Sequence, residues 1–342
     1  MVTMRDISKK AGVSVTTVSH VINETRIVSD ELRLRVLSAM EELRYRPNAL
    51  ARSLRRGETT TIGLIVPNNA NPFFSEIARG IEDTTYKEGY SLILCNSDDD
   101  VSRELRYTRT LIDNQADGII FVAAGGSEDS LQLLDDRNVP FVIVDRNISS
   151  VSADSVLIDN RSGGEQATDH LLQLNHRRIG CITGPSNLNS SIDRVAGYID
   201  TIKRAELKID DNLIVKGNFD FDSGYRCANE LFALKKPPTA IFACNDMMAI
   251  GAIRAAKDAD IEVPSQLSVV GFDGIPLAKY VTPPLTTVQQ PKHELGQIAS
   301  ELLLSRIQNK ELPIRQRILD TILMIRESTT IALDSPNDTR SA

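Results

Sequence analysis

The chain has 342 residues, 41% hydrophobic and 25% charged, which is ordinary for a soluble globular protein and suits a small domain joined to a larger one. No apolar run reaches the roughly 18 residues of a transmembrane helix, so no membrane partner is expected. The opening MVTMRDISKKAG lacks the apolar core of a secretory signal, which argues against an exported binding protein, and we expect a cytoplasmic one.

Charge is distributed unevenly along the chain. Residues 1–58 hold 11 Lys and Arg against 7 Asp and Glu, a net of +4, whereas the whole chain is −7, so residues 59–342 carry −11. A basic segment is expected to meet a polyanion, and DNA is the first candidate. The acidic remainder is interpreted as a sensing domain.

Three short helices are predicted within the basic segment. The first begins with a capping-box-like pair, Thr3 and Asp6, and Gly12 ends it. After a tight turn the second runs over Val15–Asn23, and the third ends before Pro47. Two helices joined by a short glycine-containing turn form the helix-turn-helix unit.

The second of these helices has one apolar side and one short polar side. Val18, Val21 and Ile22 recur at spacings of three and four and are expected to face the core. Short hydroxyls and an imidazole suit base edges and phosphates in a DNA major groove. The alternative is an ordinary three-helix domain with a solvated polar surface. The side chains expected to point away from the core are Val15, Thr16, Thr17, Ser19 and His20.

A short segment, ALARSLRR, follows Asn48 and is closed by Gly57. A helix of two turns is marginal alone in water, so this one is expected to form only against a partner. Leu50 and Leu54 fall on one face among several arginines, and an apolar wedge flanked by arginines suits insertion into a DNA minor groove. The alternative is an interdomain linker whose charges are merely solvated.

From Thr61 onward, short apolar runs alternate with helical patterns. Ten such runs over about 270 residues predict two doubly wound units with parallel sheets, joined near 160–164, and a final strand near ILMIRES is expected to cross back. The predicted strands cover residues 62–67, 91–96, 118–124, 140–145, 155–160, 178–184, 214–219, 240–245, 267–273 and 286–291.

Residue patterns for catalysis or metal binding are absent from the sequence. The four cysteines lie far apart with no C-x-x-C pair, which favours free thiols over a disulfide framework or a zinc site. His170 and His176 lack metal-ligand spacing and are interpreted as helix-surface or capping groups. No G-x-G-x-x-G follows the first strand, and there is no P-loop or G-x-S-x-G. We therefore expect no enzyme activity, no metal and no other cofactor.

Polar and aromatic residues recur at the carboxyl ends of the predicted strands, where doubly wound folds bind ligands. Carboxylates paired with amides or arginine can bond adjacent sugar hydroxyls, and phenylalanine rings cover the C–H face of a sugar. Each residue alone has another explanation, such as a surface ion pair, a turn or the core. The set comprises Asn71, Phe73, Phe74, Asp145, Arg146, Arg194, Phe219, Asn245, Asp246, Asp273 and Gln290.

The first 57 residues, with MRDISKKAGVSVTTVSHVINE and YRPNALARSLRRG, resemble the DNA-binding head of the LacI/GalR family of transcription regulators, and the resemblance continues to about Glu327. It implies a homodimer that binds double-stranded operator DNA, and a two-lobed domain like the periplasmic binding proteins. The implied divisions are a head at 1–46, a hinge helix at 47–58 and an effector domain at 59–342. Lobe one would cover about 59–160 and 291–319, and lobe two about 161–290 and 320–333.

The same resemblance implies which residues meet DNA. Leu54 would be the minor-groove wedge, with Arg55 beside it. Backbone or positioning contacts would come from Ser29, Tyr45 and Asn48. Base contacts would come from Val15, Thr16, Thr17, His20 and Arg26.

The strand-end residues resemble the sugar contacts of the periplasmic ribose-binding proteins, and GFD with TPPLTTVQQPKHELG resembles the ribose-responsive repressors. Ala123 departs from the ribose-binding pattern, and Leu188 replaces an arginine of the purine-responsive branch. A ribose-like inducer that releases DNA is expected; control by a protein partner or by a phosphorylated sugar stays open. The implied effector contacts are Asn71, Phe73, Phe74, Asp145, Arg146, Arg194, Phe219, Asn245, Asp273 and Gln290.

Overall fold

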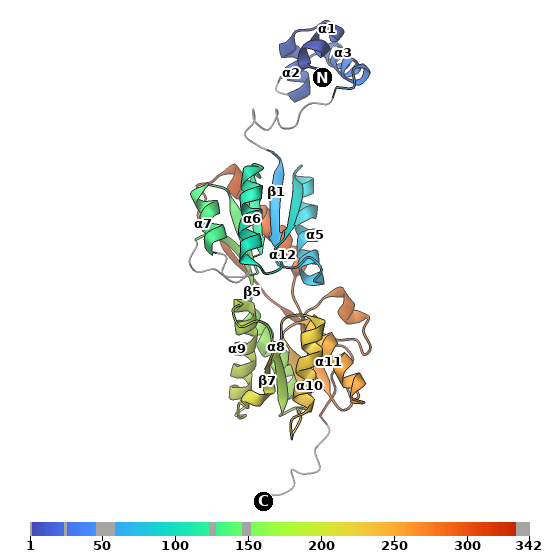
Figure 1. The fold of residues 1–342 in the computed structure, drawn as a ribbon, viewed down its shortest axis with the longest axis vertical. Coiled ribbons are helices and arrows are strands. Elements are labelled where there is room, and N and C mark those ends of the chain that lie inside the picture. The colour runs from blue at the N-terminus through green and yellow to red at the C-terminus, as the bar shows by residue number, and fades with distance from the viewer. Residues whose placement is uncertain (1, 24–25, 46–58, 123–127, 146–151, 333–342) are drawn as a thin grey trace, which may run out of the picture. The chain divides into compact units, whose positions relative to one another are not determined.

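The computed structural model describes residues 2–23, 26–45, 59–122, 128–145 and 152–332. The chain forms two compact units, Met1–Thr60 and Thr61–Ala342 (Figure 1). The hinge helix predicted at 47–58, which holds Asn48, Leu54 and Arg55, lies outside the described residues, as do Ala123 and Arg146. Within the described ranges, no helix is long and apolar enough to cross a membrane.

The first unit confirms the predicted helix-turn-helix. Its helices are α1 (Met4–Ala11), α2 (Val15–Asn23) and α3 (Asp30–Glu42). The carboxylate of Asp6 accepts hydrogen bonds from the backbone N–H of Thr3 at 2.8 Å and from its hydroxyl at 2.7 Å, which fixes the start of α1. Gly12 ends α1 at a φ of 64°, a left-handed conformation that favours glycine. The buried core is Ile7, Ala11, Val18, Val21, Val36 and Ala39.

The second unit contains two six-stranded sheets, each at the centre of one lobe (Figure 1). Lobe one has the order β11-β5-β4-β3-β1-β2, and lobe two has the order β12-β10-β9-β8-β6-β7. The strands of lobe one are β1 (Thr61–Val66), β2 (Ser91–Asn96), β3 (Gly118–Val122), β4 (Phe141–Val144), β5 (Asp154–Ile158) and β11 (Gln316–Leu319). Those of lobe two are β6 (Ile179–Thr183), β7 (Ile214–Lys216), β8 (Ala240–Ala243), β9 (Ser268–Asp273), β10 (Thr286–Gln289) and β12 (Ile322–Met324).

All ten predicted strands are present, but two details of the sheets differ from the prediction. The strand β11 was not predicted, because three of its four residues are exposed at a sheet edge and give no apolar run. The strand β12 is the expected crossing segment, and it pairs antiparallel with β10, so the second sheet is not wholly parallel. The chain thus changes lobe three times, after β5, after β10 and between β11 and β12.

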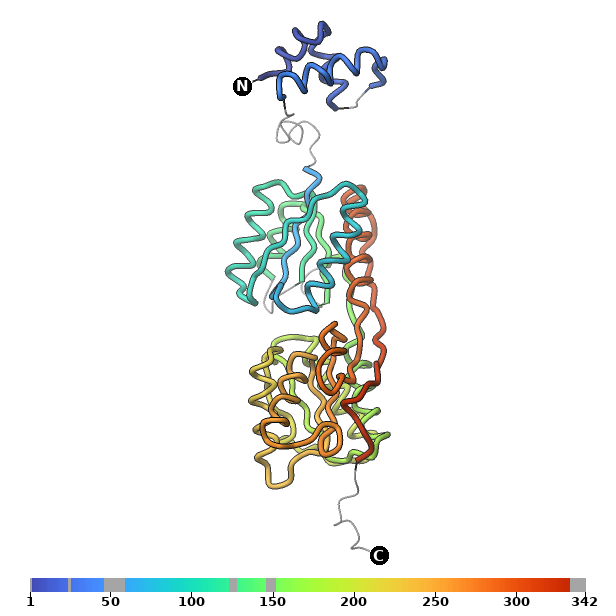
Figure 2. Tube along the Cα trace, turned by 90° about the vertical axis from the view of Figure 1, so that its right-hand side faces the viewer, coloured from blue at the N-terminus to red at the C-terminus, as the bar shows by residue number. Residues whose placement is uncertain are grey.

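Helices pack closely around both sheets (Figure 2). In lobe one, α12 lies along α5, and a side chain added at Gly80 would come within 2.2 Å of the His293 carbonyl oxygen. Gly296 meets the Ile77 carbonyl oxygen in the same way, at 2.3 Å, so the backbones of α5 and α12 lie in close contact. The helices are α5 (Pro72–Lys87), α6 (Val101–Asp113), α7 (Glu128–Asp136) and α12 (Lys292–Gln308) in lobe one, and α8 (Asn160–Gln173), α9 (Asn189–Arg204), α10 (Phe221–Phe232) and α11 (Asp246–Asp258) in lobe two.

The interpretation of His170 and His176 as helix-surface or capping groups was wrong. Both side chains are buried, and desolvation lowers the pKa of each imidazole. A ring nitrogen of His170 lies 3.0 Å from the Thr329 hydroxyl, and His176 lies 3.0 Å from the Thr330 carbonyl oxygen. They anchor the last described segment onto lobe two, a long-range contact that their local sequence does not reveal.

Candidate functional site

The helix α2 presents the predicted DNA-facing side chains away from the core of the head. Val18 and Val21 are buried, which turns Val15 (41% exposed) and Thr16 outward. The hydroxyl of Thr17 lies 2.8 Å from that of Ser14, at the N-terminus of the helix. A helix N-terminus with short exposed side chains can enter a major groove.

Of the remaining predicted DNA contacts of the head, His20 lies on α2, and Arg26, Ser29 and Tyr45 lie outside it. Arg26 and Ser29 are exposed before α3, beside Ile27, which is fully exposed and was not singled out from the sequence. His20 is half-buried, and Tyr45 packs partly against the core of the head, with its backbone N–H bonded to Met40. Tyr45 is therefore placed to position the chain where it leaves the head.

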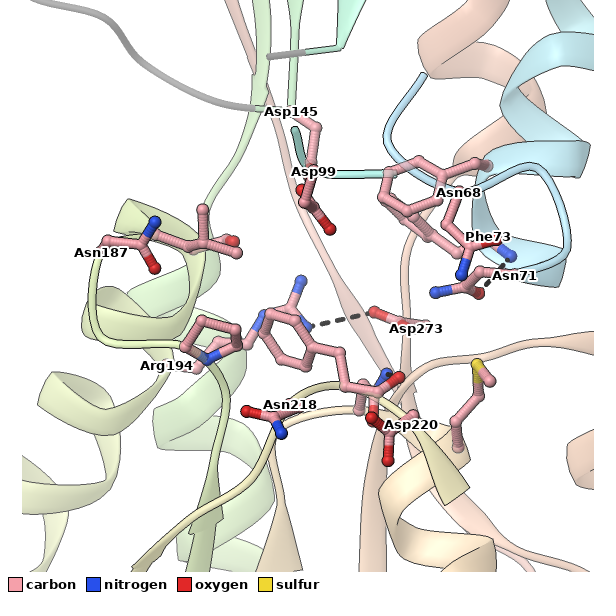
Figure 3. Close-up of a pocket in the computed structure, with 17 residues that line it drawn as sticks. Asn68, Asn71, Phe73, Asp99, Asp145, Asn187, Arg194, Asn218, Asp220 and Asp273 are labelled. Atoms are coloured by element: carbon pink, nitrogen blue, oxygen red, sulfur yellow. Dashed lines mark hydrogen bonds and ion pairs between the residues drawn. The ribbon is translucent and has the colours of Figure 1, made fainter. Parts of the chain in front are cut away.

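A cavity of about 230 Å³ lies where the carboxyl ends of strands from both lobes meet (Figure 3). Eight of the ten predicted effector residues line it: Asn71, Phe73, Phe74, Asp145, Arg194, Phe219, Asn245 and Asp273. Gln290 does not line the cavity, and Arg146 lies outside the described residues.

The wall from lobe one is built at the start of α5. Asn71 caps this helix, since its side-chain oxygen accepts a bond from the backbone N–H of Phe73 at 3.0 Å, and Pro72 occupies the first helical position. The rings of Phe73 and Phe74 meet edge to face with centroids 5.0 Å apart. Both rings are buried at the cavity, where they offer an apolar surface beside the polar Asn71.

Arg194 organises the wall from lobe two. The residue is 3% exposed, and its guanidinium donates to the Asn160 side chain at 2.8 Å and to the Cys244 carbonyl oxygen at 2.6 Å. The carbon of the guanidinium lies 3.8 Å from the centre of the Phe272 ring, a cation–π contact. The fixed guanidinium also donates to Asp273 at 3.2 Å, the bond drawn in Figure 3.

Asp273 ends β9 in a left-handed backbone conformation, with a φ of 104°. Its Oδ1 accepts bonds from Arg194 and from the Gln290 amide at 2.7 Å, which leaves Oδ2 unused by these two donors. Burial raises the pKa of Asp273 to about 6, although the positive charges of Arg194 and Lys292 lower it. The carboxylate is therefore ionised at neutral pH and can accept hydrogen bonds from a ligand.

Gln290 lies behind Asp273 because β10 ends one residue earlier and the amide turns toward the β9 carboxylate. Asp246, predicted as a ligand contact from its position after a strand, is also not at the cavity. It is fully buried, accepting from the Thr287 hydroxyl at 2.5 Å and the Ile275 N–H at 2.7 Å, and burial raises its pKa to about 8. Asn245 both caps α11 and donates to the Phe219 carbonyl oxygen at 3.0 Å, which holds that residue at the cavity.

Further polar residues at the cavity were missed by the sequence reasoning. They lie in the loops after β1, β2, β6 and β7 or at the start of the helix that follows. Because doubly wound folds bind ligands beyond the carboxyl ends of their strands, including the whole of each loop in the prediction would have found them. Asp99 and Asp220 add negative charge to the cavity. Four carboxylates line it, those of Asp99, Asp145, Asp220 and Asp273, together with one guanidinium among its described residues. The missed polar residues are Asn68, Asp99, Asn187, Ser190, Asn218 and Asp220.

Two family models match this chain. The model for periplasmic binding proteins and the sugar binding domain of the LacI family matches residues 59–326, and the model for bacterial regulatory proteins of the lacI family matches residues 3–48. The chain belongs to the LacI family of bacterial regulatory proteins. This LacI-family chain is thus a DNA-binding transcriptional repressor with a sugar-binding type of domain, and not an enzyme.

Two curated relatives match this chain over nearly its whole length and over nearly the whole of their own. The HTH-type transcriptional repressor PurR of Photobacterium profundum is 39% identical over 96% of this chain and 98% of its own length. The ribose operon repressor of Escherichia coli (strain K12) is 41% identical over 96% of this chain and 100% of its own.

Solved structures confirm the predicted fold class of the LacI-family regulator. The lac repressor dimer bound to operator and the anti-inducer ONPF matches with a TM-score of 0.85 and 27% identity, over 96% of this chain and 99% of its own. A LacI family transcriptional regulator from Enterococcus faecium with bound ribose matches with a TM-score of 0.74 and 33% identity, over 80% of this chain and 100% of its own.

Proposed function

We propose that a neutral, ribose-like monosaccharide binds in the cavity between the lobes and controls the affinity of a cytoplasmic homodimer for operator DNA. The observation that carries this proposal is the pairing of Asp273 and Arg194 beside Phe73 and Phe219 at the meeting point of both lobes. Relatives named for ribose, and a neighbouring structure with ribose bound, support the same effector.

The chemistry of the lining favours a polyol. Adjacent sugar hydroxyls both donate and accept, so carboxylates, amides and a guanidinium can each satisfy one of them. The buried phenylalanine rings can cover the C–H face of the sugar and exclude water. An analogue without hydroxyls would leave the ionised Asp273 without ligand donors and is expected to bind poorly.

The size and charge of the cavity narrow the class of effector further. A volume of about 230 Å³ is below the roughly 300 Å³ at which pockets for drug-sized ligands begin, which favours one sugar ring over two. The carboxylates of Asp99, Asp145 and Asp220 would repel a phosphate group. Leu188 lines the cavity as a buried apolar residue, where the purine-responsive branch carries an arginine.

The DNA side of the proposal follows the predicted divisions: a head at 1–46, a hinge helix at 47–58 and an effector domain at 59–342. Base contacts are assigned to Val15, Thr16, Thr17, His20 and Arg26, positioning contacts to Ser29, Tyr45 and Asn48, and the minor-groove wedge to Leu54 with Arg55 beside it. Sugar binding releases DNA if the sugar prefers the form of the protein with the lower operator affinity.

A homodimer would place one head on each half of a pseudo-palindromic operator. Lobe one has an exposed apolar surface suited to such an interface. The edge strand β2 exposes Ile93 (40%) and Leu94 (43%), and the neighbouring α5 exposes Tyr86 (78%). Exposed apolar side chains grouped on a sheet edge commonly mark a protein contact.

Isothermal titration of the purified protein with D-ribose, other pentoses, hexoses, ribose 5-phosphate and hypoxanthine tests the effector. Binding of one ribose per chain, without measurable binding of ribose 5-phosphate or hypoxanthine, is expected. Preferential binding of either of these two would overturn the neutral-sugar proposal. The absence of heat with every compound would favour a regulator controlled by a protein partner.

A further inference from the structure

Lys292 is a buried cation that lies between the two lobes. It is the first residue of α12, and its side chain is 4% exposed. Its ammonium donates to the backbone carbonyl oxygens of Asp273 at 2.7 Å and Gly274 at 2.8 Å. The ammonium also lies 3.3 Å from the carboxylate of Glu76 on α5.

Burying the Lys292 ammonium at the start of α12 costs free energy unless its contacts compensate for that cost. A lysine side chain is seldom buried, and a positive charge at the first turn of a helix opposes the helix dipole. The carbonyl groups of Asp273 and Gly274 compensate because both residues adopt left-handed backbone conformations, with φ of 104° and 66°. Their two oxygens thereby converge on the Lys292 ammonium.

The partners of Lys292 belong to different lobes. Asp273 ends β9 in lobe two and Gly274 follows it, whereas α12 and α5 pack together in lobe one. Glu76 lies on α5 five residues after Asn71, which caps that helix at the cavity. A single ammonium therefore connects the turn that bears the Asp273 carboxylate to the helix that forms the opposite wall.

We propose that Lys292 is a positioning residue for the effector site, fixing the Asp273–Gly274 turn against lobe one so that the Asp273 carboxylate faces the cavity, ionised. This inference rests on the proposed role of Asp273 in sugar binding. The positive charge of Lys292 acts together with that of Arg194 and against the negative charge of Asp145. The buried Asp246, whose pKa is raised to about 8, is uncharged in the pH range in which Asp273 titrates.

The carboxyl of Asp273 can be observed without any ligand. Carbon-13 NMR of protein labelled at the aspartate carboxyl carbons, with the signal assigned through Asp273→Asn, gives its titration midpoint. The midpoint is expected near pH 6 in the natural protein. In Lys292→Met it should rise by about one pH unit, since a nearby positive charge is lost. Lys279→Met removes an exposed lysine from the neighbouring short 3-10 helix Pro276–Lys279 and should leave the midpoint unchanged.

Titration with D-ribose at pH 7 gives the second measurement. Lys292→Met should bind ribose roughly tenfold more weakly, and Lys279→Met should bind like the natural protein. If Lys292→Met does not fold, Lys292→Gln keeps a donor without the charge and should show the same two changes. Lys292→Arg, which restores the charge, should recover part of both.

The outcomes separate the two proposals. Equal Asp273 midpoints in the natural protein and the neutral Lys292 variants would overturn the positioning role, as would an unchanged ribose affinity. If the natural protein does not bind ribose at all, the proposed effector is wrong, while the NMR midpoint still decides whether Lys292 controls Asp273.

Discussion

Asp273→Asn is the substitution that most directly separates charge from shape at the cavity. The amide has the size of the carboxylate and can still accept bonds from Arg194 and Gln290, so the fold is expected to persist. The substitution replaces Oδ2 by an NH2 group. Oδ2 accepts no bond from Arg194 or Gln290 and is proposed to accept bonds from sugar hydroxyls. Hydrogen bonds to a charged acceptor contribute about 1.5–3 kcal/mol each, against roughly 0.5–1.5 kcal/mol for neutral pairs.

If two hydroxyls bond to this carboxylate, the substitution should cost about 2–3 kcal/mol, or roughly 30- to 150-fold in the Kd for ribose. The pH dependence should change as well. Burial raises the pKa of Asp273 to about 6, so the competent ionised form is present above this pH and is lost below it. Affinity in the natural protein should therefore fall roughly fivefold between pH 6 and pH 5, as the ionised fraction drops from about one half to about one eleventh.

Isothermal titration with D-ribose at pH values from 5 to 8 measures both effects. Asp273→Asn should bind weakly at every pH and lose most of the fall below pH 6. Asp260→Asn is a matched control, because Asp260 is exposed and also has a positive φ, and it should behave like the natural protein. A pH profile that is the same in Asp273→Asn as in the natural protein would refute the assignment of Asp273 as the ionised acceptor.

Four further substitutions test other parts of the account. Gly184→Ala would place a methyl group 2.1–2.6 Å from the Phe219 ring, so it should weaken ribose binding at least tenfold while leaving operator binding intact, measurable by titration and fluorescence anisotropy. Arg146→Ala should abolish the effector response and spare DNA binding; a response at the original effector concentration would show that the site is misplaced. Leu54→Ala should weaken operator binding without unfolding the protein, and unchanged affinity in a gel-shift titration would remove the minor-groove argument. Leu94→Glu should convert the dimer to a monomer in sedimentation velocity, and a persistent dimer would place the interface elsewhere.

Features with a strong local pattern were predictable from the sequence. The helix Val15–Asn23 and the strand Ser91–Asn96 have the predicted bounds, because the helical spacing of apolar side chains defines the helix and a short apolar run defines the strand. Eight effector candidates line the cavity because parallel strands place their carboxyl ends together. The location of the site thus follows from the carboxyl ends of the predicted strands.

Features that depend on long-range contacts were not predictable. Gln290 and Asp246 also follow strands, but the next turn directs their side chains behind the cavity, to Asp273 and to Thr287. The strand β11 has no apolar run because it forms an exposed sheet edge. His176 looks like a surface residue in the sequence, yet it is buried against Thr330, more than 150 residues away.

Operator binding in the presence of the sugar tests the central claim most directly. A fluorescently labelled operator, selected by the protein from a pool of random duplexes, would be titrated with protein by anisotropy, without ribose and with saturating D-ribose. We expect tight binding without ribose and release when ribose is added, with no release by ribose 5-phosphate. Operator affinity that is unchanged by D-ribose, in a protein shown to be folded, would contradict it.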